Sequence, residues 1–160
     1  MAGHLDHFTI DPQRAAGFFH DVGVSQQRRA KYTQSLTSLH AALTIFEAID
    51  PPNHPNIAIT LTNIGLTQQL LGDYTDSLAT LKRALTIKEA TYPPDHPSIA
   101  ITLTNIGSTQ QRLGDYKDSL ATLQRALTIN EATYPPDHPT RRWVLPMLVR
   151  VMAISGWSGG

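Results

Sequence analysis

The chain has 160 residues, no cysteine, and equal numbers of basic and acidic side chains, 13 of each. This balance argues against nucleic acid or an anionic membrane as a partner, because both require a basic excess. The absence of cysteine excludes disulfides and thiolate metal sites, and it fits a reducing compartment. The length predicts a single compact domain or a short array of repeats.

The sequence predicts neither a signal peptide nor a membrane-spanning helix. The first residues, MAGHLDHFTIDPQ, lack the basic stretch and apolar core of a signal peptide. The longest apolar run, Trp143 to Ile154, contains Pro146 and Arg150 and is shorter than the roughly 20 residues that span a bilayer. Residues 1–11 show no period and are predicted to form a flexible lead-in. We therefore expect a soluble, cytoplasmic protein.

The rest of the chain is built from one repeated unit. Residues 54–95 and 96–137 are copies offset by 42 positions, and they differ at only six of them. A degenerate copy occupies residues 12–53, where Ala30 replaces the glycine of the central turn, so that a less well-defined turn is expected. A repeat of this period predicts a solenoid, in which each unit buries its apolar face against its neighbours.

Each copy is predicted to form two helices, named helix A and helix B below. In the middle copy, helix A begins at Pro55, because proline lacks only an N–H that the first helical position leaves unbonded. Helix A ends before Gly72, which tolerates the left-handed conformation that closes many helices. Asp73 is expected to cap helix B, and Pro93-Pro94 ends it.

Small residues recur where helices A and B should cross, at Gly65, Ser77 and Ala84, and their equivalents follow in the other copies. They predict an axis separation at the short end of the usual 8–10 Å. The wider core is predicted at Leu61, Ile64, Leu78, Leu81, Leu85, Ile87 and their equivalents. None of the six differences is expected in the core; Lys88, which is Asn130 in the next copy, is placed away from the apolar stripe of helix B.

Residues 138–160 begin in register with His138-Pro139 and then lose the repeat. A final helix would have Leu145, Leu148, Val149 and Met152 on its inner face, although Pro146 is expected to interrupt it. Because the segment is apolar nearly all round, it is either a capping segment that something else covers or a tail.

The repeated motifs A-x-x-L-x-N-I-G, L-G-D-Y, S-L-x-x-L-x-R-A-L-x-I and P-P-D-H-P resemble the tetratricopeptide repeat. The long period resembles the subclass found in kinesin light chains and nephrocystin-like proteins, and the resemblance covers about residues 12–139. It implies an all-α, right-handed solenoid of three helical hairpins, whose helices A line a concave groove that binds peptides or proteins. The position that usually holds a large aromatic residue is glutamine here, at 26, 68 and 110.

At 100° per residue, the candidate groove residues lie on the face of helix A that points away from helix B, with Asn63, Asn105 and Arg112 at its edge. They are Thr62, Asn63, Leu66 and Gln69 in the middle copy, Thr104, Asn105, Ser108, Gln111 and Arg112 in the next, and His20 and Gln27 in the first.

Asn63 and Asn105 recur one repeat apart, and their carboxamides could bind the backbone of an extended peptide. Asparagines on this helix hold peptide backbones in related repeats, but Asn63 could equally bond a neighbouring helix. Arg28 and Arg112 could pair with an acidic peptide. The regular lysine and asparagine set that clamps a C-terminal carboxylate is missing, so a ligand of that kind is not expected.

The sequence favours no catalytic chemistry. His54, His96 and His138 recur with the repeat beside proline, in successive linkers that do not converge on the single point that a zinc ion requires. Neither a G-x-S-x-G elbow nor a phosphate-binding P-loop is present. We expect neither an enzyme nor a bound cofactor or metal.

Two functions remain in view. The first is a non-catalytic adaptor that binds a peptide segment of a partner protein in the groove. The alternative is a structural or self-association module, such as a piece of a longer repeat array, that uses the apolar residues 143–154.

Overall fold

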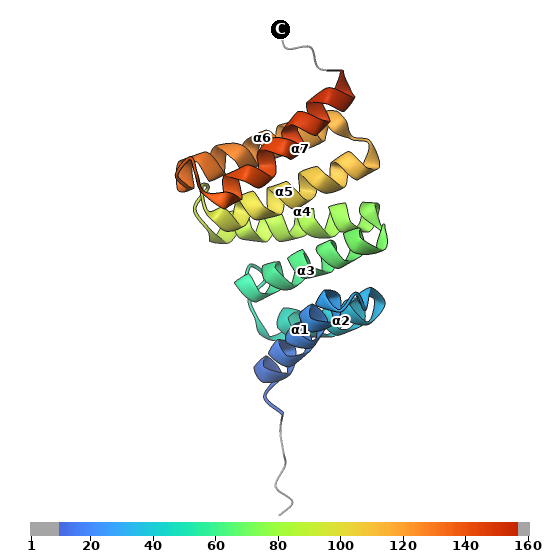
Figure 1. Ribbon diagram of the computed structural model, residues 1–160. Helices are drawn as coiled ribbons and strands as arrows, with labels where there is room; N and C mark the ends of the chain where they lie inside the picture. Colours follow the sequence, from blue (N-terminus) through green and yellow to red (C-terminus); the bar gives the residue numbers. More distant parts are fainter. Residues whose placement is uncertain (1–9, 157–160) are drawn as a thin grey trace, which may run out of the picture.

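The protein folds into a single stack of helices (Figure 1). The computed structural model describes residues 10–156, except for the side chains of residues 140, 141, 143 and 155. Helices are the only regular elements of this part: α1 (Pro12–Arg28), α2 (Tyr32–Ile49), α3 (Pro55–Leu71), α4 (Tyr74–Thr91), α5 (Pro97–Leu113), α6 (Tyr116–Thr133) and α7 (Pro139–Ser155). The flexible lead-in predicted for residues 1–11 lies mostly outside the described residues; Asp11 caps α1 by accepting from the backbone N–H of Gln13 at 3.0 Å.

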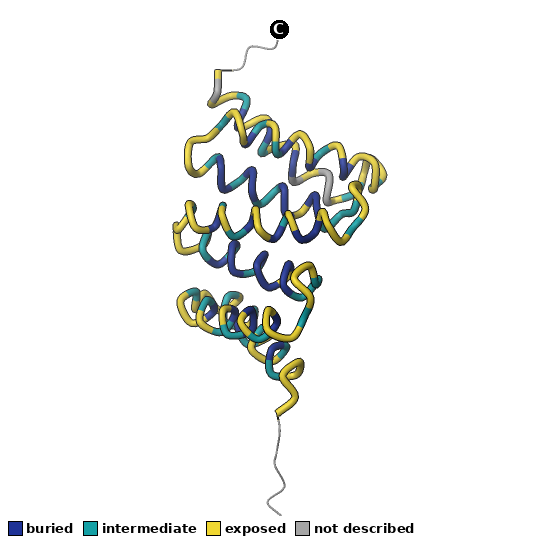
Figure 2. Tube along the Cα trace, turned by 180° about the vertical axis from the view of Figure 1, so that it is seen from behind, coloured by how far each residue is buried: buried dark blue, intermediate teal, exposed yellow. Residues whose placement is uncertain are grey.

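Helices α1 and α2, α3 and α4, and α5 and α6 form three hairpins, and α7 packs as the first helix of a fourth. Each helix contacts the next one along the chain, and the helices A also contact one another, α1 with α3, α3 with α5 and α5 with α7. In the described part of the chain, no Cα atoms of α2, α4 and α6 come within 8 Å of one another. The helices A are therefore on the inner side of the stack, and buried residues lie where neighbouring helices face each other (Figure 2).

The predicted boundaries of helices A and B in the middle copy are confirmed, and histidine side chains cap α3 and α5 where an aspartate, Asp11, caps α1. The Nδ1 atoms of His54 and His96 accept hydrogen bonds from the backbone N–H groups of Asn56 and Ser98, at 3.3 and 3.1 Å. This arrangement satisfies an N–H that the first turn leaves unbonded. Asp73 occupies the cap position of α4, but its side chain makes no capping hydrogen bond, so the predicted role of that side chain is wrong.

The three central turns have the same backbone conformation. Gly72 and Gly114 have φ angles of 90° and 86°, and Ala30 has a φ of 57°. The N–H of the following residue bonds back to Gln68 O in the middle copy and to Gln26 O in the first, at 2.9 Å in both. The less well-defined turn expected at Ala30 is therefore wrong: the closing hydrogen bond forms, although an alanine in this conformation is strained by about 1 kcal/mol or more.

The close crossing predicted within each hairpin is confirmed. A Cβ atom added to Gly65 would lie 2.6 Å from Leu81 Cγ, and one added to Gly107 would lie 2.6 Å from Leu123 Cγ. The Ser77 hydroxyl donates to the carbonyl of Gly65 at 2.8 Å, so that the contact includes a buried hydrogen bond. The first copy repeats this geometry, with Gly23 against Leu39 and Ser35.

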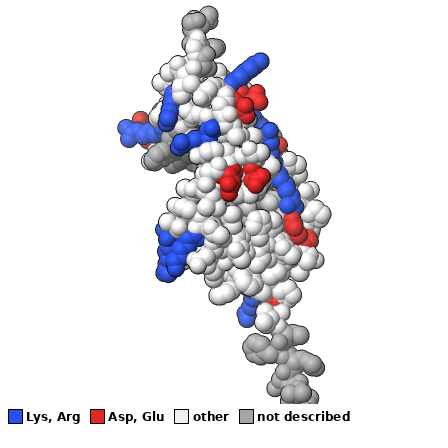
Figure 3. Space-filling model, turned by 90° about the vertical axis from the view of Figure 1, so that its right-hand side faces the viewer, with Lys and Arg blue, Asp and Glu red and all other residues white. Residues whose placement is uncertain are grey.

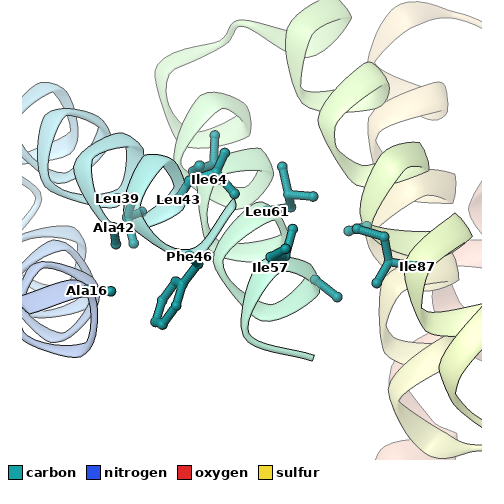
Figure 4. Packing of buried hydrophobic residues seen from close by; sticks show 11 residues of the cluster. Ala16, Leu39, Ala42, Leu43, Phe46, Ile57, Leu61, Ile64 and Ile87 are labelled. Atoms are coloured by element: carbon teal, nitrogen blue, oxygen red, sulfur yellow. The ribbon is translucent and has the colours of Figure 1, made fainter. Parts of the chain in front are cut away.

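Figure 4 shows how helices α1 to α4 share one core, with Phe46 of α2 and Ile87 of α4 on either side of Ile57 and Leu61 of α3. Of the predicted core residues in the middle copy, Leu61, Ile64, Leu81 and Ile87 are buried. Leu78 and Leu85 are half-buried instead, and Leu85 packs against the core cluster that α5, α6 and α7 share.

The placement of Lys88 and Asn130 away from the core is wrong. Lys88 is 4% exposed and Asn130 is 2% exposed. The Lys88 ammonium donates to the hydroxyl of Thr102 on α5 at 2.8 Å. Lys88 thus points toward the next helix A, a face of helix B that the apolar period of helix B alone does not reveal. Burial lowers the pKa of Lys88 from 10.5 to about 8.

Helix α7 continues through Pro146, so the expected interruption is wrong. Its buried residues are Val144, Leu148 and Val151, while Leu145 and Val149 are 48% and 63% exposed. Of the predicted inner face, Leu148 is therefore correct, and Leu145 and Val149 are wrong. The helix keeps the 42-residue register, so Val144, Leu148 and Val151 occupy the positions of Thr102, Ile106 and Thr109 and pack against the preceding hairpin. Pro146 has no N–H to donate to the backbone carbonyl four residues earlier. Because Pro146 lies on an exposed side of the helix, water can bond to that carbonyl instead.

Within residues 10–156, the structure contains no helix with the length and hydropathy needed to cross a membrane. On the face shown in Figure 3, acidic and basic groups are interspersed between large uncharged areas.

Candidate protein-interaction groove

The predicted groove residues project from the inner faces of α1, α3 and α5, and they differ in how far a partner could reach them. Thr62 is buried, and its hydroxyl donates to Ala58 O at 2.8 Å. The hydroxyl of Thr104 donates in the same way to Ala100 O at 2.9 Å. These two threonines thus offer little hydrogen bonding to a partner. The remaining positions, His20, Gln27, Asn63, Leu66, Gln69, Asn105, Ser108 and Gln111, are half-buried, and Arg112 is exposed.

Glutamines join successive helices A. Gln27 Nε2 donates to Thr67 Oγ1 at 2.9 Å, linking α1 to α3. One repeat later, Gln69 Nε2 donates to Thr109 Oγ1 at 3.1 Å and lies 3.4 Å from Ser108 Oγ, linking α3 to α5. These amides therefore hold the stack together at the wall of the groove.

The two asparagines have different surroundings, although they are equivalent in the repeat. Asn63 Nδ2 lies 3.0 Å from Nε2 of His20 on α1. The carboxamide donates to an unprotonated Nε2 when the ring proton is on Nδ1, which lies 3.5 Å from Asp21 Oδ1. In the next repeat Thr62 replaces His20, and within the described residues no hydrogen bond reaches the Asn105 side chain.

Exposed apolar residues lie along the same face, toward the N-terminal ends of the helices. Ile59 is 44% exposed and Ile101 is 52% exposed, and they are one repeat apart. Asn105 follows Ile101 by one helical turn, so α5 presents an accessible apolar side chain beside an unpaired carboxamide.

Two hollows lie between neighbouring helices A near their C-terminal ends. One, of about 310 Å³, is lined by Gln27, Arg28, Leu66, Gln69 and Leu70. The other, of about 390 Å³, lies between α5 and α7 and is lined by Ser108, Gln111, Arg112, Tyr116, Pro146, Met147, Arg150 and Ile154. The hollows are equivalent in the repeat, because Gln111 and Arg112 follow Gln27 and Arg28 by two periods.

Sequence reasoning missed Arg150, although it could have been found. The repeat is no longer visible after residue 139, so residues of α7 were not assigned to the groove. Counting the 42-residue register onward places Arg150 opposite Ser108, a position already assigned to the groove. The unchanged length of the helix, 17 residues in both α5 and α7, keeps this register intact.

Nothing in the geometry suggests a metal centre. Within the described part of the chain, no three histidine, cysteine, aspartate or glutamate side chains are grouped so as to hold a metal ion. His54 and His96 use Nδ1 as helix caps, and the His96 ring stacks on Tyr92 with centroids 4.2 Å apart.

The family model named Tetratricopeptide repeat matches residues 14–90, 61–132 and 98–154, which together cover the three hairpins and most of α7. The chain belongs to the tetratricopeptide repeat family. The all-α solenoid fold predicted from the motifs is thereby confirmed, as is the resemblance to kinesin light chain repeats.

Solved structures with the same fold include kinesin-light-chain-type, nearly identical TPR-like repeats from Podosopora anserina, with a TM-score of 0.82 and 18% identity over 92% of this chain and 70% of that one. BtubC (BKLC) from P. vanneervenii gives a TM-score of 0.86 and 15% identity over 94% of this chain and 60% of that one. The first TPR of Spaghetti (RPAP3), bound to the HSP90 peptide SRMEEVD, gives a TM-score of 0.67 and 12% identity over 94% of this chain and 99% of that one. A comparison with curated protein sequences finds no match.

Proposed function

We propose that this tetratricopeptide repeat protein is a non-catalytic adaptor that binds a peptide segment of a partner protein along α1, α3 and α5. The observation that carries the proposal is the pair formed on α5 by exposed Ile101 and the unpaired carboxamide of Asn105. An extended peptide needs both, because an apolar anchor provides affinity and a carboxamide can donate to and accept from its backbone. The peptide-bound TPR of Spaghetti, which has the same fold, supports this choice. A cytoplasmic setting, which the balanced charge and the lack of cysteine favour, belongs to the proposal.

Asn105 is expected to contribute to binding, and Asn63 to stability. Asn105→Ala should weaken a peptide selected by the wild-type protein by about two- to tenfold, the range for one net hydrogen bond. Asn63→Ala breaks the contact with His20 and should lower the free energy of unfolding by about 1 kcal/mol. The measurement is selection from a displayed peptide library, followed by fluorescence polarisation and urea unfolding.

Gln124→Ala is the matched control, because it removes an exposed carboxamide from α6 on the outer side of the stack. Equal affinity of the wild-type and Asn105→Ala proteins would remove this residue from the proposal. If the folded wild-type protein enriches no peptide at all, the groove is not a peptide-binding site.

A second candidate function is self-association through the outer face of α7. Leu145 and Val149 occupy the positions that Leu103 and Gly107 hold in the preceding hairpin, where α6 covers them. No helix follows α7 within the described residues, so both side chains are exposed. The predicted self-association segment, residues 143–154, includes Trp143, whose side chain lies outside the described residues. Deleting residues 140–160 is a poor test, because it also removes core residues Val144, Leu148 and Val151.

If α7 mediates self-association, light scattering should show a species larger than the monomer at tens of micromolar, and Val149→Asp should restore the monomer. A charge at a position that is 63% exposed should leave the fold intact in the monomer. Thr128→Asp, at an exposed position of α6, is the control and should leave the assembly unchanged. A monomeric wild-type protein would end this candidate.

A further inference from the structure

We propose that the hollow between α5 and α7 binds the side-chain carboxylate of an acidic residue in the partner peptide. The proposal rests on the peptide-binding function above and names the chemistry that one end of the groove selects. Three observations in the part of the chain that the structure describes support it: an amide without a partner, two arginines without an acidic partner, and an equivalent hollow that lacks both features.

The amide belongs to Gln111. Gln27 and Gln69, its equivalents, donate to Thr67 and Thr109 on the next helix A. On α7, the next helix A after α5, the position equivalent to Thr67 and Thr109 is Val151, whose side chain offers no acceptor. Within the described residues no hydrogen bond reaches the Gln111 side chain, so its N–H groups are available to an acceptor in the hollow.

The two arginines are Arg112 and Arg150, and both line the same hollow. No carboxylate lies within 4.0 Å of either guanidinium in the described part of the chain, and the lining includes no aspartate or glutamate. By contrast, Arg83 and Arg125 on the outer side are paired with Glu47 and Glu89. Two like charges beside one hollow repel each other, and a bound anion converts that repulsion into attraction.

The equivalent hollow between α1 and α3 shows what is distinctive about the hollow between α5 and α7. It contains a single arginine, Arg28, and the position of Arg150 is taken by Leu66. Its glutamine, Gln27, already donates to Thr67. The groove therefore repeats one shape with different chemistry, and among the described residues only the α5–α7 step brings two cations and an available amide together.

A carboxylate fits this set better than other groups. A guanidinium presents parallel N–H donors that match the two oxygens of a carboxylate. The hollow, about 390 Å³, is at the small end of ligand sites, and Pro146, Met147 and Ile154 give it an apolar wall. We therefore expect a glutamate or aspartate with an apolar neighbour, within a segment that continues along α5 and α3.

The test is a selection of displayed peptides that have no free C-terminus, so that any acidic preference comes from side chains. Peptides selected by the wild-type protein should be enriched in an acidic residue. By fluorescence polarisation, replacing that residue with its amide should weaken binding about tenfold or more, as expected for a charge-assisted hydrogen bond. Arg112→Gln/Arg150→Gln should weaken the acidic peptide to the same extent and leave the amide peptide unaffected. Raising the salt concentration should reduce the difference.

Arg83→Gln/Arg125→Gln is the matched control, because it removes the same net charge from the outer side and should leave the preference intact. Peptides that bind without an acidic preference, or a preference that survives Arg112→Gln/Arg150→Gln, would overturn this inference and leave the proposed function standing. If the folded protein selects no peptide, both fail.

Discussion

Gly65→Leu is expected to destabilise the protein by about 3 kcal/mol or more, at the upper end of the range for overpacking a close contact. The Cβ atom alone would lie 2.6 Å from Leu81 Cγ and 2.8 Å from Leu81 Cδ2. Leu81 is itself fully buried, so its side chain can move only by displacing other buried groups in a close-packed interior. The hairpin of α3 and α4 would have to open, which also breaks the bond from Ser77 to the Gly65 carbonyl. The loss in free energy of unfolding is measured by urea denaturation monitored by circular dichroism.

Gly17 provides the matched control, because it is a glycine within a helix whose Cβ would meet no atom within 4 Å. Gly17→Ala should stabilise the protein by roughly 0.5–1 kcal/mol through helix propensity, whereas Gly65→Ala should destabilise it. The alanine pair keeps the comparison informative even when Gly65→Leu does not fold. A Gly65→Ala variant as stable as Gly17→Ala would contradict the close crossing.

Lys88→Met is expected to stabilise the protein near neutral pH by about 1–3 kcal/mol, because it removes a buried charge that has no acidic partner in the described structure. Burial lowers the pKa of Lys88 from 10.5 to about 8, so between these values the unfolded chain holds a proton that the folded chain has released. Stability must then rise with pH over this window, and the penalty is fully present below about pH 8. Thr102 keeps a partner in the variant, since its hydroxyl also donates to Ser98 O.

The measurement is the free energy of unfolding of both proteins at several pH values from 7 to 10.5. The free energy of unfolding of the wild-type protein should rise relative to that of the variant, and the difference between the two should shrink as Lys88 loses its proton. Tyrosines ionise near the top of this range in both proteins, so the difference between the two curves isolates Lys88. Lys82→Met, at an exposed position of the same helix, should shift stability little and keep the wild-type pH dependence. Parallel curves for wild type and Lys88→Met would contradict a buried, partly deprotonated lysine.

The equivalent positions explain how such a lysine is tolerated. Phe46 stands there in the first copy and Asn130 in the third, and both are buried. The site is thus a junction between one helix B and the next helix A that accepts apolar, polar and charged side chains. Local sequence gives no sign of this burial, because position 88 lies off the apolar stripe that faces the partner helix within the hairpin.

The sequence predicted the groove only in part, as it did the surroundings of position 88. The helical period placed Asn63 and Asn105 on one face of helix A, and the structure agrees. It could not show that the carboxamide of Asn63 contacts His20 while that of Asn105 has no partner among the described residues, because that difference depends on which residue the previous helix A presents. Nor could it assign Arg150, because the register is hidden in the sequence of α7.

By itself, the sequence determined the hairpins, their boundaries and the close crossings. These depend on interactions within about 40 residues and on residues with strong backbone or steric preferences, namely Pro55, Gly72 and Gly65. Only the tertiary structure decided which faces meet between hairpins: the burial of Lys88, the inner face of α7 with Val144 and Val151, and the hollow that joins Arg112 to Arg150. The physical reason is that packing between repeats depends on the rotation of one hairpin against the next, which many weak contacts set together and no single motif encodes.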